Sequence, residues 1–275
     1  MYTGSTVRRM TLTVVLLGLA VSTVWASDHS SCRELEAWPD AELEGFLRDA
    51  EVVAVEDVGE GITEPKRVTL RRGDRTCRAI FKDIDVESNE LALTNRFEMG
   101  FSDKYLYEIA AYRLDRLLGM RLVPVTVQRE IEGRQGSLQL WIEDATTLED
   151  AAERDLPIGD ERLLLERLMS MYVFDQLIAN VDRNFGNVLV RPERDELYLI
   201  DHSRAFRTTR DIAPPPEPAT TPVNPAVASA MRAVDRRAVD TALGDLLSKR
   251  QRRSILDRRD ELVELLEEMG LLPEQ

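Results

Sequence analysis

The chain has 275 residues, 43% of them hydrophobic, with 36 lysines and arginines against 50 aspartates and glutamates. This length and apolar content allow a folded core and exclude an intrinsically disordered chain, a multi-span membrane protein and a small disulfide scaffold. The net charge of −14 argues against general nucleic-acid binding, and the presence of only two histidines, His29 and His202, argues against a multi-histidine zinc site.

The first 26 residues have the pattern of a secretory signal peptide. Arg8 and Arg9 precede an apolar stretch over residues 10–22, and a cleavage site follows at 24–26. The apolar stretch is shorter than the about 20 residues of a membrane-spanning helix. We therefore expect residues 1–26 to be removed on export to the periplasm, a secretory lumen or the medium. A retained leader would instead anchor the chain to a membrane.

Export bears on the two cysteines, Cys32 and Cys77. In an oxidising compartment they can pair in a disulfide, or they can remain two separate buried thiols. The sequence leaves both alternatives open.

The first half of the mature chain predicts a small antiparallel sheet with one main helix. Charged and apolar residues alternate at helical spacing first, and strand patterns follow. A loop with two glycines, residues 59–63, separates the first two strands. In chain order, we expect a helix at 34–49, strands at 52–55, 67–70 and 77–82, a helix at 105–118, and strands at 122–129 and 137–142.

The second half predicts mainly helices. Residues 162–180 are apolar nearly all the way round, which is typical of a helix at the centre of a lobe. Short strands are expected at 188–190 and 197–200. Six of the twelve prolines lie from Pro214 to Pro225 and predict an extended surface loop over residues 213–225. Helices are expected at 226–247 and 252–269.

Residue types that suit phosphoryl transfer gather between Asp182 and Asp201. Asp182 and Asn187 lie on the loop after the buried helix, and Asp201 follows a short hairpin. One carboxylate can orient an attacking hydroxyl, while the amide and the second carboxylate can hold Mg²⁺ against nucleotide phosphates. The Asp-x4-Asn spacing alone is weak evidence, so the order of the elements around it carries the interpretation.

This order resembles the two-lobed protein-kinase-like fold, in its atypical branch. Residues 180–187 look like the Asp-Arg-x-x-x-Asn loop of the HipA-type bacterial kinases and the phosphatidylinositol kinases. Residues 199–206 resemble the metal-binding Asp motif that replaces Asp-Phe-Gly in this branch, which also includes secretory-pathway kinases related to the Golgi casein kinase. The resemblance implies an α+β fold, with a small antiparallel-sheet N-lobe and one main helix over residues 27–142, and a mostly helical C-lobe over residues 143–275.

The resemblance also implies a role for each motif residue. Lys82 would contact the α and β phosphates of ATP and pair with Glu108, and Asp182 would be the catalytic base. Asn187 and Asp201 would bind Mg²⁺. The remaining nucleotide-binding positions would be Gly59, Gly61 and Thr63 over the phosphates, and Leu140 and Ile142 at the hinge beside the adenine.

Each assignment has a structural alternative. The chain has four lysines against 32 arginines, so a lysine inside an apolar strand is unusual, but Lys82 can also be a solvated strand end. Glu108 can be an exposed helix residue. Asp182 and Asn187 can cap the long helix as turn residues, and Asp201 can end a strand. We expect His202 to support its loop rather than to donate protons.

The sequence therefore predicts an exported, Mg²⁺- and ATP-dependent phosphotransferase. Its partners would be ATP and a hydroxyl-bearing acceptor, with a protein Ser or Thr favoured over a lipid or sugar, and no nucleic acid. Two alternatives remain: a non-catalytic binding module on a kinase-like scaffold (a pseudokinase), and an unrelated structural envelope protein.

Overall fold

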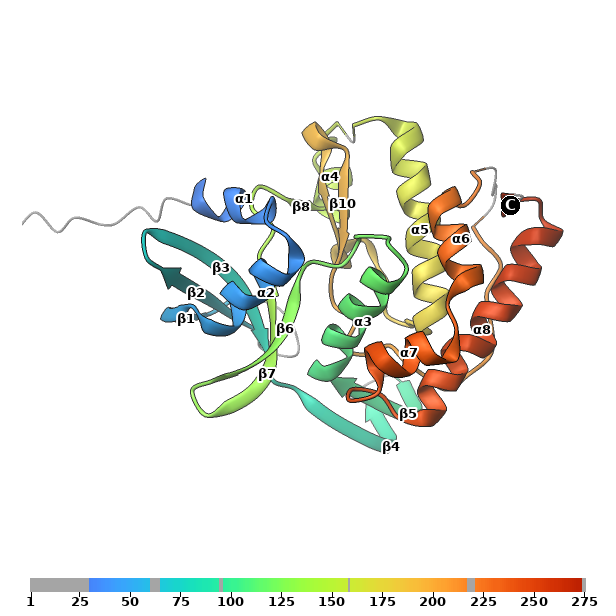
Figure 1. The fold of residues 1–275 in the computed structure, drawn as a ribbon, viewed down its shortest axis with the longest axis horizontal. Helices are drawn as coiled ribbons and strands as arrows, with labels where there is room; N and C mark the ends of the chain where they lie inside the picture. The colour runs from blue at the N-terminus through green and yellow to red at the C-terminus, as the bar shows by residue number, and fades with distance from the viewer. Residues whose placement is uncertain (1–29, 60–64, 94–95, 158, 217–220, 274–275) are drawn as a thin grey trace, which may run out of the picture.

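A computed structural model describes residues 30–59, 65–93, 96–157, 159–216 and 221–273. Over these residues the protein is an α+β structure of two lobes, with a sheet in the N-terminal lobe and long helices in the C-terminal lobe (Figure 1). The predicted fold class is confirmed. The expected signal peptide lies outside the described residues, and no helix within them is long and apolar enough to cross a membrane.

The N-terminal lobe is built on a five-stranded antiparallel sheet, in the order β1-β2-β3-β7-β6. The central strand β3 alternates buried and half-buried residues, so one face packs into the core while the other carries Lys82. Lys82 is paired with Ser137 of β7 in the ladder. The strands are β1 (Glu51–Asp57), β2 (Lys66–Arg72), β3 (Arg75–Lys82), β6 (Thr126–Ile131) and β7 (Arg134–Leu140).

The main helix of this lobe, α3 (Tyr105–Leu117), packs against β6 and β7 on one side and against a helix of the C-terminal lobe on the other. It ends beside Gly119, whose φ of 67° suits the left-handed position that follows many helices. The helix is thus close to the predicted one. Its position between the lobes (Figure 1) lets its side chains reach both.

A two-stranded hairpin precedes α3, formed by β4 (Asp85–Leu93) and β5 (Arg96–Lys104). This hairpin was not predicted, although Phe97, Met99 and Phe101 alternate with polar residues or glycine in β5. Its ladder is held by backbone hydrogen bonds, which place no demand on side-chain polarity. The hairpin matters for the site because the N–H of Lys104, its last residue, donates to the carbonyl of Ser203 (2.8 Å).

The C-terminal lobe is centred on α5, which packs against α8 (Figure 1). Asp160 begins α5 by accepting hydrogen bonds from the backbone N–H groups of Arg162 and Leu163. A small sheet of β8, β9 and β10 precedes the last helices. The elements are β8 (Thr146–Thr147), α4 (Leu148–Glu153), α5 (Glu161–Ile178), β9 (Val188–Arg191), β10 (Glu196–Leu199), α6 (Pro225–Ala233), α7 (Arg236–Leu243) and α8 (Lys249–Glu268), with 3-10 turns at Phe185–Asn187 and Pro192–Arg194.

Two predicted helices are each broken in two. The helix expected at 34–49 is α1 (Ser30–Glu36) and α2 (Asp40–Asp49), because Pro39 interrupts the helical hydrogen bonds. The helix expected at 226–247 is α6 and α7, and the Asp235 side chain caps the second by accepting from the N–H of Ala238 (2.8 Å). Because α6 begins at Pro225, the expected loop over 213–225 ends one residue earlier, at Asn224.

Helix α1 is tied to both lobes. A disulfide joins Cys32 to Cys77 of β3, which decides between the two alternatives for the cysteines. On the other side, both carboxylate oxygens of Glu36 accept from the Arg191 guanidinium of β9, each at 2.7 Å. Arg191 is buried and also donates to the backbone carbonyl of Glu143 (2.7 Å). Helix α1 therefore links the sheet of one lobe to the small sheet of the other.

Replacing Cys32 and Cys77 together with alanine is expected to lower the free energy of unfolding by about 2–4 kcal/mol, because the disulfide restricts the unfolded chain between residues 45 positions apart. Urea denaturation of the oxidised protein measures this. Dithiothreitol should destabilise the wild type by a similar amount and leave the double variant unchanged. A double variant as stable as the oxidised wild type would contradict the prediction.

Asp115, near the end of α3, makes the stability of the fold depend on pH. Burial raises the pKa of its carboxyl to about 6 from an ordinary value of 3.8, although Arg116 and the N–H of Leu122 favour the ionised form. A raised pKa means that the folded state holds the proton more tightly. The stabilisation is complete at a pH below the pKa of this carboxyl in the unfolded chain. It is lost as the pH rises through the pKa of the carboxyl in the folded protein.

The difference in unfolding free energy between the wild type and Asp115→Asn should therefore fall as the pH rises from about 4 to about 7. Taking the difference removes the effect of the other carboxyl groups, which titrate in both proteins. Urea denaturation at steps of pH measures it. A difference that is constant or that grows with pH would contradict the assignment.

Candidate active site

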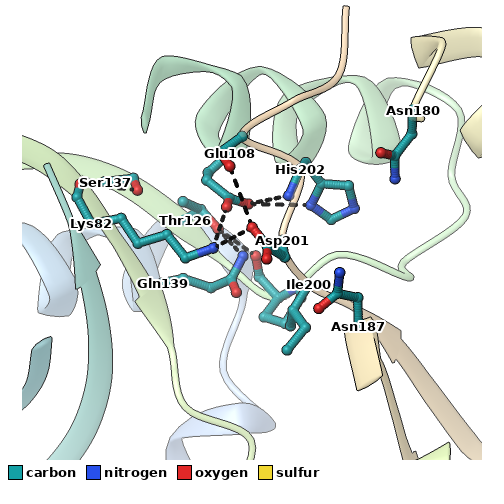
Figure 2. Close-up of polar contacts among 12 residues, drawn as sticks. Lys82, Glu108, Thr126, Ser137, Gln139, Asn180, Asn187, Ile200, Asp201 and His202 are labelled. Atoms are coloured by element: carbon teal, nitrogen blue, oxygen red, sulfur yellow. Dashed lines mark hydrogen bonds and ion pairs between the residues drawn. The ribbon is translucent and has the colours of Figure 1, made fainter. Parts of the chain in front are cut away.

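Lys82 lies between two carboxylates that come from distant parts of the chain. Its Nζ is 2.6 Å from Glu108 Oε1 of α3 and 2.8 Å from Asp201 Oδ1, just beyond β10 (Figure 2). The side chain of Glu108 is only 2% exposed, so the alternative that it is an exposed helix residue is wrong. Lys82 is 13% exposed, so it is not a solvated strand end either.

These contacts keep Lys82 and Glu108 charged. Burial alone would lower the pKa of Lys82, but the charges of Glu108 and Asp201 outweigh it and raise the pKa above its ordinary value. Burial alone would raise the pKa of Glu108, and the Lys82 charge and a hydrogen bond from His202 bring it below its ordinary range. A fixed ammonium at the end of a central strand suits the binding of an anionic ligand.

His202 supports Glu108 from the side away from Lys82. Its backbone N–H donates to Glu108 Oε2 (3.0 Å), and its Nδ1 lies 3.3 Å from the same oxygen. The ring is fully buried, edge to face with Phe174, and burial lowers its pKa. Its Nε2 is buried without a hydrogen-bond partner among the described residues. The neutral imidazole thus orients Glu108, which agrees with the expected supporting role.

The loop after α5 is braced by Arg183. Its guanidinium binds the Asp175 carboxylate at 2.9 and 3.1 Å, and one nitrogen also donates to the carbonyls of Asn187 (2.7 Å) and Ile200 (2.9 Å). The helix itself ends at Ala179, which has a left-handed φ of 47°. Arg183 therefore joins the helix, the loop and the segment that carries Asp201. It is 11% exposed and its donors are used within the protein.

Asp182 lies on this loop with its carboxylate turned outward. Its side chain is 41% exposed, and Oδ2 lies 3.2 Å from Arg204 Nη1. Its backbone N–H donates to Asn180 Oδ1 (3.2 Å), and its carbonyl accepts from Asn187 Nδ2 (3.3 Å). The carboxylate therefore takes no part in capping α5. It is available to a molecule that approaches the loop from outside.

Asn187 and Asp201 suit a magnesium ion. The N–H of Ile200 donates to the Asn187 carbonyl (3.1 Å), which brings the two segments together (Figure 2). Because the amide nitrogen of Asn187 is used by Asp182, its amide oxygen remains for a metal. Asp201 Oδ1 accepts from Lys82 and from Ser203 Oγ (3.3 Å), leaving Oδ2. Among the described residues no cluster of three His, Cys, Asp or Glu side chains could hold a metal. One carboxylate oxygen and one amide oxygen suit Mg²⁺, which usually takes one or two carboxylates and completes its shell with phosphates and water.

The predicted nucleotide-binding positions fall partly outside the described chain. Gly61 and Thr63 lie outside the described residues. Gly59 lies within them and has a φ of 74°, which favours glycine. Leu140 and Ile142 are both buried where β7 ends. The N–H of Trp141 between them donates to the carbonyl of Arg78 on β3 (3.1 Å). These residues therefore lie at the passage from the sheet to the second lobe, where a hinge was expected.

Three polar residues near Lys82 were not predicted, namely Asp103, Thr126 and Gln139. Asp103 of β5 is 6% exposed, and its Oδ1 has no hydrogen-bond partner within the described ranges. Burial raises the pKa of its carboxyl, the charge of Asp201 adds to this effect, and Ser203, Lys82 and Arg204 oppose it. Gln139 of β7 is buried and donates to Thr126 Oγ1 (3.0 Å), near Lys82 in Figure 2. Asp103 lies in the hairpin that was not predicted, and Gln139 lies between Leu138 and Leu140 of β7, where a polar residue among apolar neighbours was a signal.

The sequence comparisons reach only part of the chain. No protein-family model matches it. The protein Rv2133c of Mycobacterium tuberculosis is 32% identical over 126 residues, a match that covers 34% of this chain and 44% of that protein. The chain thus aligns with less than half of the length of this curated relative.

Solved structures match over most of the chain. The structure of hydra Fam20 with sugar has a TM-score of 0.61 at 16% identity, covering 83% of this chain and 88% of that one. The Golgi casein kinase with Mn/ADP bound has a TM-score of 0.56 at 14% identity, covering 82% and 75%. The Helicobacter pylori proinflammatory kinase CtkA has a TM-score of 0.52 at 12% identity, covering 83% and 99%. The chain therefore has the kinase-like, two-lobed fold of these structures.

Proposed function

We propose that the protein is a Mg²⁺- and ATP-dependent kinase that transfers a phosphoryl group to a hydroxyl of its acceptor. The observation that carries the proposal is the contact of Lys82 with both Glu108 and Asp201, 2.6 and 2.8 Å from its Nζ. These three residues come from a strand, a helix and a loop far apart in the chain. A buried lysine held by two carboxylates from distant segments is typical of a site that binds nucleotide phosphates.

Each residue has a part in this reaction. Lys82, held in place by Glu108, binds the phosphate oxygens of the nucleotide. Asp201 and Asn187 are the metal ligands. Asp182 accepts the proton of the acceptor hydroxyl as that oxygen attacks. When bound, Mg²⁺-ATP supplies the transferable phosphoryl group and the positive charge that neutralises its oxygens.

The similar solved structures support a kinase in this fold. One of them is named for a casein kinase and holds Mn and ADP, and another is named a kinase in its own right. We favour a protein Ser or Thr as acceptor. The sugar in the hydra Fam20 structure makes a glycan the next candidate, ahead of a lipid.

The disulfide between Cys32 and Cys77 supports export, because such bonds persist in oxidising compartments. We therefore place the activity in the periplasm, a secretory lumen or outside the cell. Whether residues 1–26 are cleaved is a separate question. Mass spectrometry of the protein purified from its natural source answers it, since cleavage predicts a chain that begins at Ser27.

The test begins with nucleotide binding by the purified full chain. Isothermal titration with ATP should show binding that needs Mg²⁺ and is lost in EDTA, and Lys82→Ala should weaken it. Transfer of labelled phosphate is then measured to three acceptors: a Ser/Thr peptide library, an oligosaccharide mixture and phosphatidylinositol vesicles. Asp182→Ala is the control that identifies transfer at this site.

The outcomes separate the alternatives. Transfer that depends on Asp182 supports the kinase and identifies the acceptor class. Nucleotide binding without Asp182-dependent transfer would make the protein a kinase-like binding module. A protein that binds no nucleotide with any metal would be a structural protein on this fold, and the proposal would fail.

A further inference from the structure

The segment that carries Asp201 also carries a cation, Arg204, whose backbone is held on both sides. The carbonyl of Ser203 accepts from the N–H of Lys104 (2.8 Å), and the N–H of Phe206 donates to the carbonyl of Ile178 at the end of α5 (2.5 Å). Between them, the N–H of Ala205 donates to the carbonyl of His202 (3.0 Å) and closes a turn. Arg204 therefore projects from a segment fixed to the hairpin before α3 and to the end of α5.

The guanidinium of Arg204 reaches the residue to which we assign proton transfer. Its Nη1 lies 3.2 Å from Asp182 Oδ2. The side chain of Arg204 is 21% exposed and that of Asp182 is 41% exposed, so the pair lies at the open side of the site. Arg183, the neighbouring cation, is used to join the helix and the loop. Lys82 is used by Glu108 and Asp201.

The position of this ion pair matters because the transferred phosphoryl group must pass beside it. In the proposed reaction the transferred group lies between the metal ligand Asp201 and the hydroxyl held by Asp182. Arg204 contacts Asp182 and lies three positions after Asp201 on the same short segment. A guanidinium is always charged and presents a planar fork of donors that matches phosphoryl oxygens.

We propose that Arg204 is a catalytic residue that binds the phosphoryl group in transfer and neutralises its charge, with the Asp182 ion pair as its resting contact. The inference rests on the proposed kinase function. An arginine supplied by the same chain plays this part in other phosphoryl-transfer enzymes. Here it requires no large movement, because the backbone that carries the arginine is already fixed.

The reaction balances without further reactants. The bond between the γ-phosphorus and the oxygen that bridges it to the β-phosphate breaks, and that oxygen leaves with ADP. The bond between the γ-phosphorus and the acceptor oxygen forms, and the hydroxyl proton passes to Asp182. Arg204 exchanges no atoms and no electrons. It donates hydrogen bonds to phosphoryl oxygens whose charge is greatest during transfer.

The test compares binding of a ground-state product with binding of a transition-state mimic. ADP and ADP with aluminium fluoride, each with Mg²⁺, are titrated into the full chain. Water takes the place of the acceptor hydroxyl, so the acceptor need not be known. The fluoride complex should bind the wild type at least about 10²-fold more tightly than ADP alone. Arg204→Ala should bind ADP within about threefold of the wild type and lose most of that 10²-fold gain, and Arg204→Lys should lose part of it.

Two comparisons exclude a merely structural role. Arg210→Ala removes an exposed arginine of the same segment, which pairs with Asp257 of α8 at 2.7 Å. This variant should leave unchanged the fluoride gain, which is the factor by which ADP with aluminium fluoride binds more tightly than ADP alone. In an Asp182→Asn background, Arg204→Ala should still reduce the gain. If Arg204 acts only by holding Asp182, its removal will have no effect in that background, and the proposal is overturned.

Failure of this inference can be told from failure of the proposed function. A wild type that binds Mg-ADP and transfers phosphate, beside an Arg204→Ala variant with an undiminished fluoride gain, would overturn the role of Arg204 alone. A wild type that binds neither ADP nor its fluoride complex would overturn the kinase itself, and the role of Arg204 with it. Thermal melts of each variant confirm that the compared proteins are folded, and Arg204→Lys serves if the alanine variant is not.

Discussion

Asp182→Asn is expected to lower the kcat of phosphoryl transfer by about 10²–10⁴-fold while leaving the Kd of Mg-ATP within about threefold of the wild type. The reason is the position of the carboxylate. It is 41% exposed on the loop after α5, where its Oδ2 pairs with Arg204, and only the backbone carbonyl of Asp182 accepts from Asn187. Asparagine keeps the shape of the side chain and cannot accept the proton. Initial rates with labelled ATP and isothermal titration measure the two quantities.

Asp150→Asn is the matched control for this variant, since it changes an exposed aspartate of α4. It should leave kcat and Kd unchanged. If Asp182→Asn retained more than about a tenth of the wild-type rate, Asp182 would not be the general base. A loss of Mg-ATP binding equal to the loss of rate would instead make Asp182 a nucleotide ligand.

Glu108→Gln is expected to lower the free energy of unfolding by about 3 kcal/mol, because it removes one partner of a buried ion pair. Glu108 is 2% exposed and holds Lys82 with one oxygen and the backbone N–H of His202 with the other. A neutral amide leaves the Lys82 charge balanced by Asp201 alone. The same variant should weaken Mg-ATP binding by about tenfold or more, because Lys82 is then drawn toward the metal ligand.

Urea denaturation and titration with Mg-ATP test both effects in one protein. Glu261→Gln, an exposed glutamate of α8, is the matched control and should change unfolding by less than about 0.5 kcal/mol. A stable Glu108→Gln variant with normal nucleotide binding would show that the pair with Lys82 is incidental. A stable variant that fails only in binding would keep the positioning role and remove the structural one.

The motifs that could be read from the sequence were local ones. The loop from Asp182 to Asn187 and the return to Asp201 are short segments, in which residue types and spacing already restrict the chemistry. Lys82 could be singled out because lysine is rare in this chain and unexpected inside an apolar strand. The roles of these residues stay predictions until the variants are measured.

The helix breaks and the hairpin had weaker signals. Pro39 was a signal for the division between α1 and α2, and Asp235 for that between α6 and α7, but the apolar spacing continues across both. The β4–β5 hairpin had a signal that was missed, the alternation of Phe97, Met99 and Phe101 with polar residues or glycine in β5. With the hairpin missed, Asp103 could not be assigned to the site.

The order of the predicted elements and the resemblance that their motifs carry were enough to predict the two-lobed α+β fold and to suggest where its chemistry lies, because each motif depends on residues close together in the chain. Contacts between distant residues were decided only by folding. The disulfide of Cys32 with Cys77, the burial of Glu108 against Lys82 and the approach of Arg204 to Asp182 join segments whose distance in space is not recorded in their spacing. The net charge has the same limit: a value of −14 for the whole chain repels phosphate, whereas Lys82 and Arg204 lie where we propose that a phosphate binds.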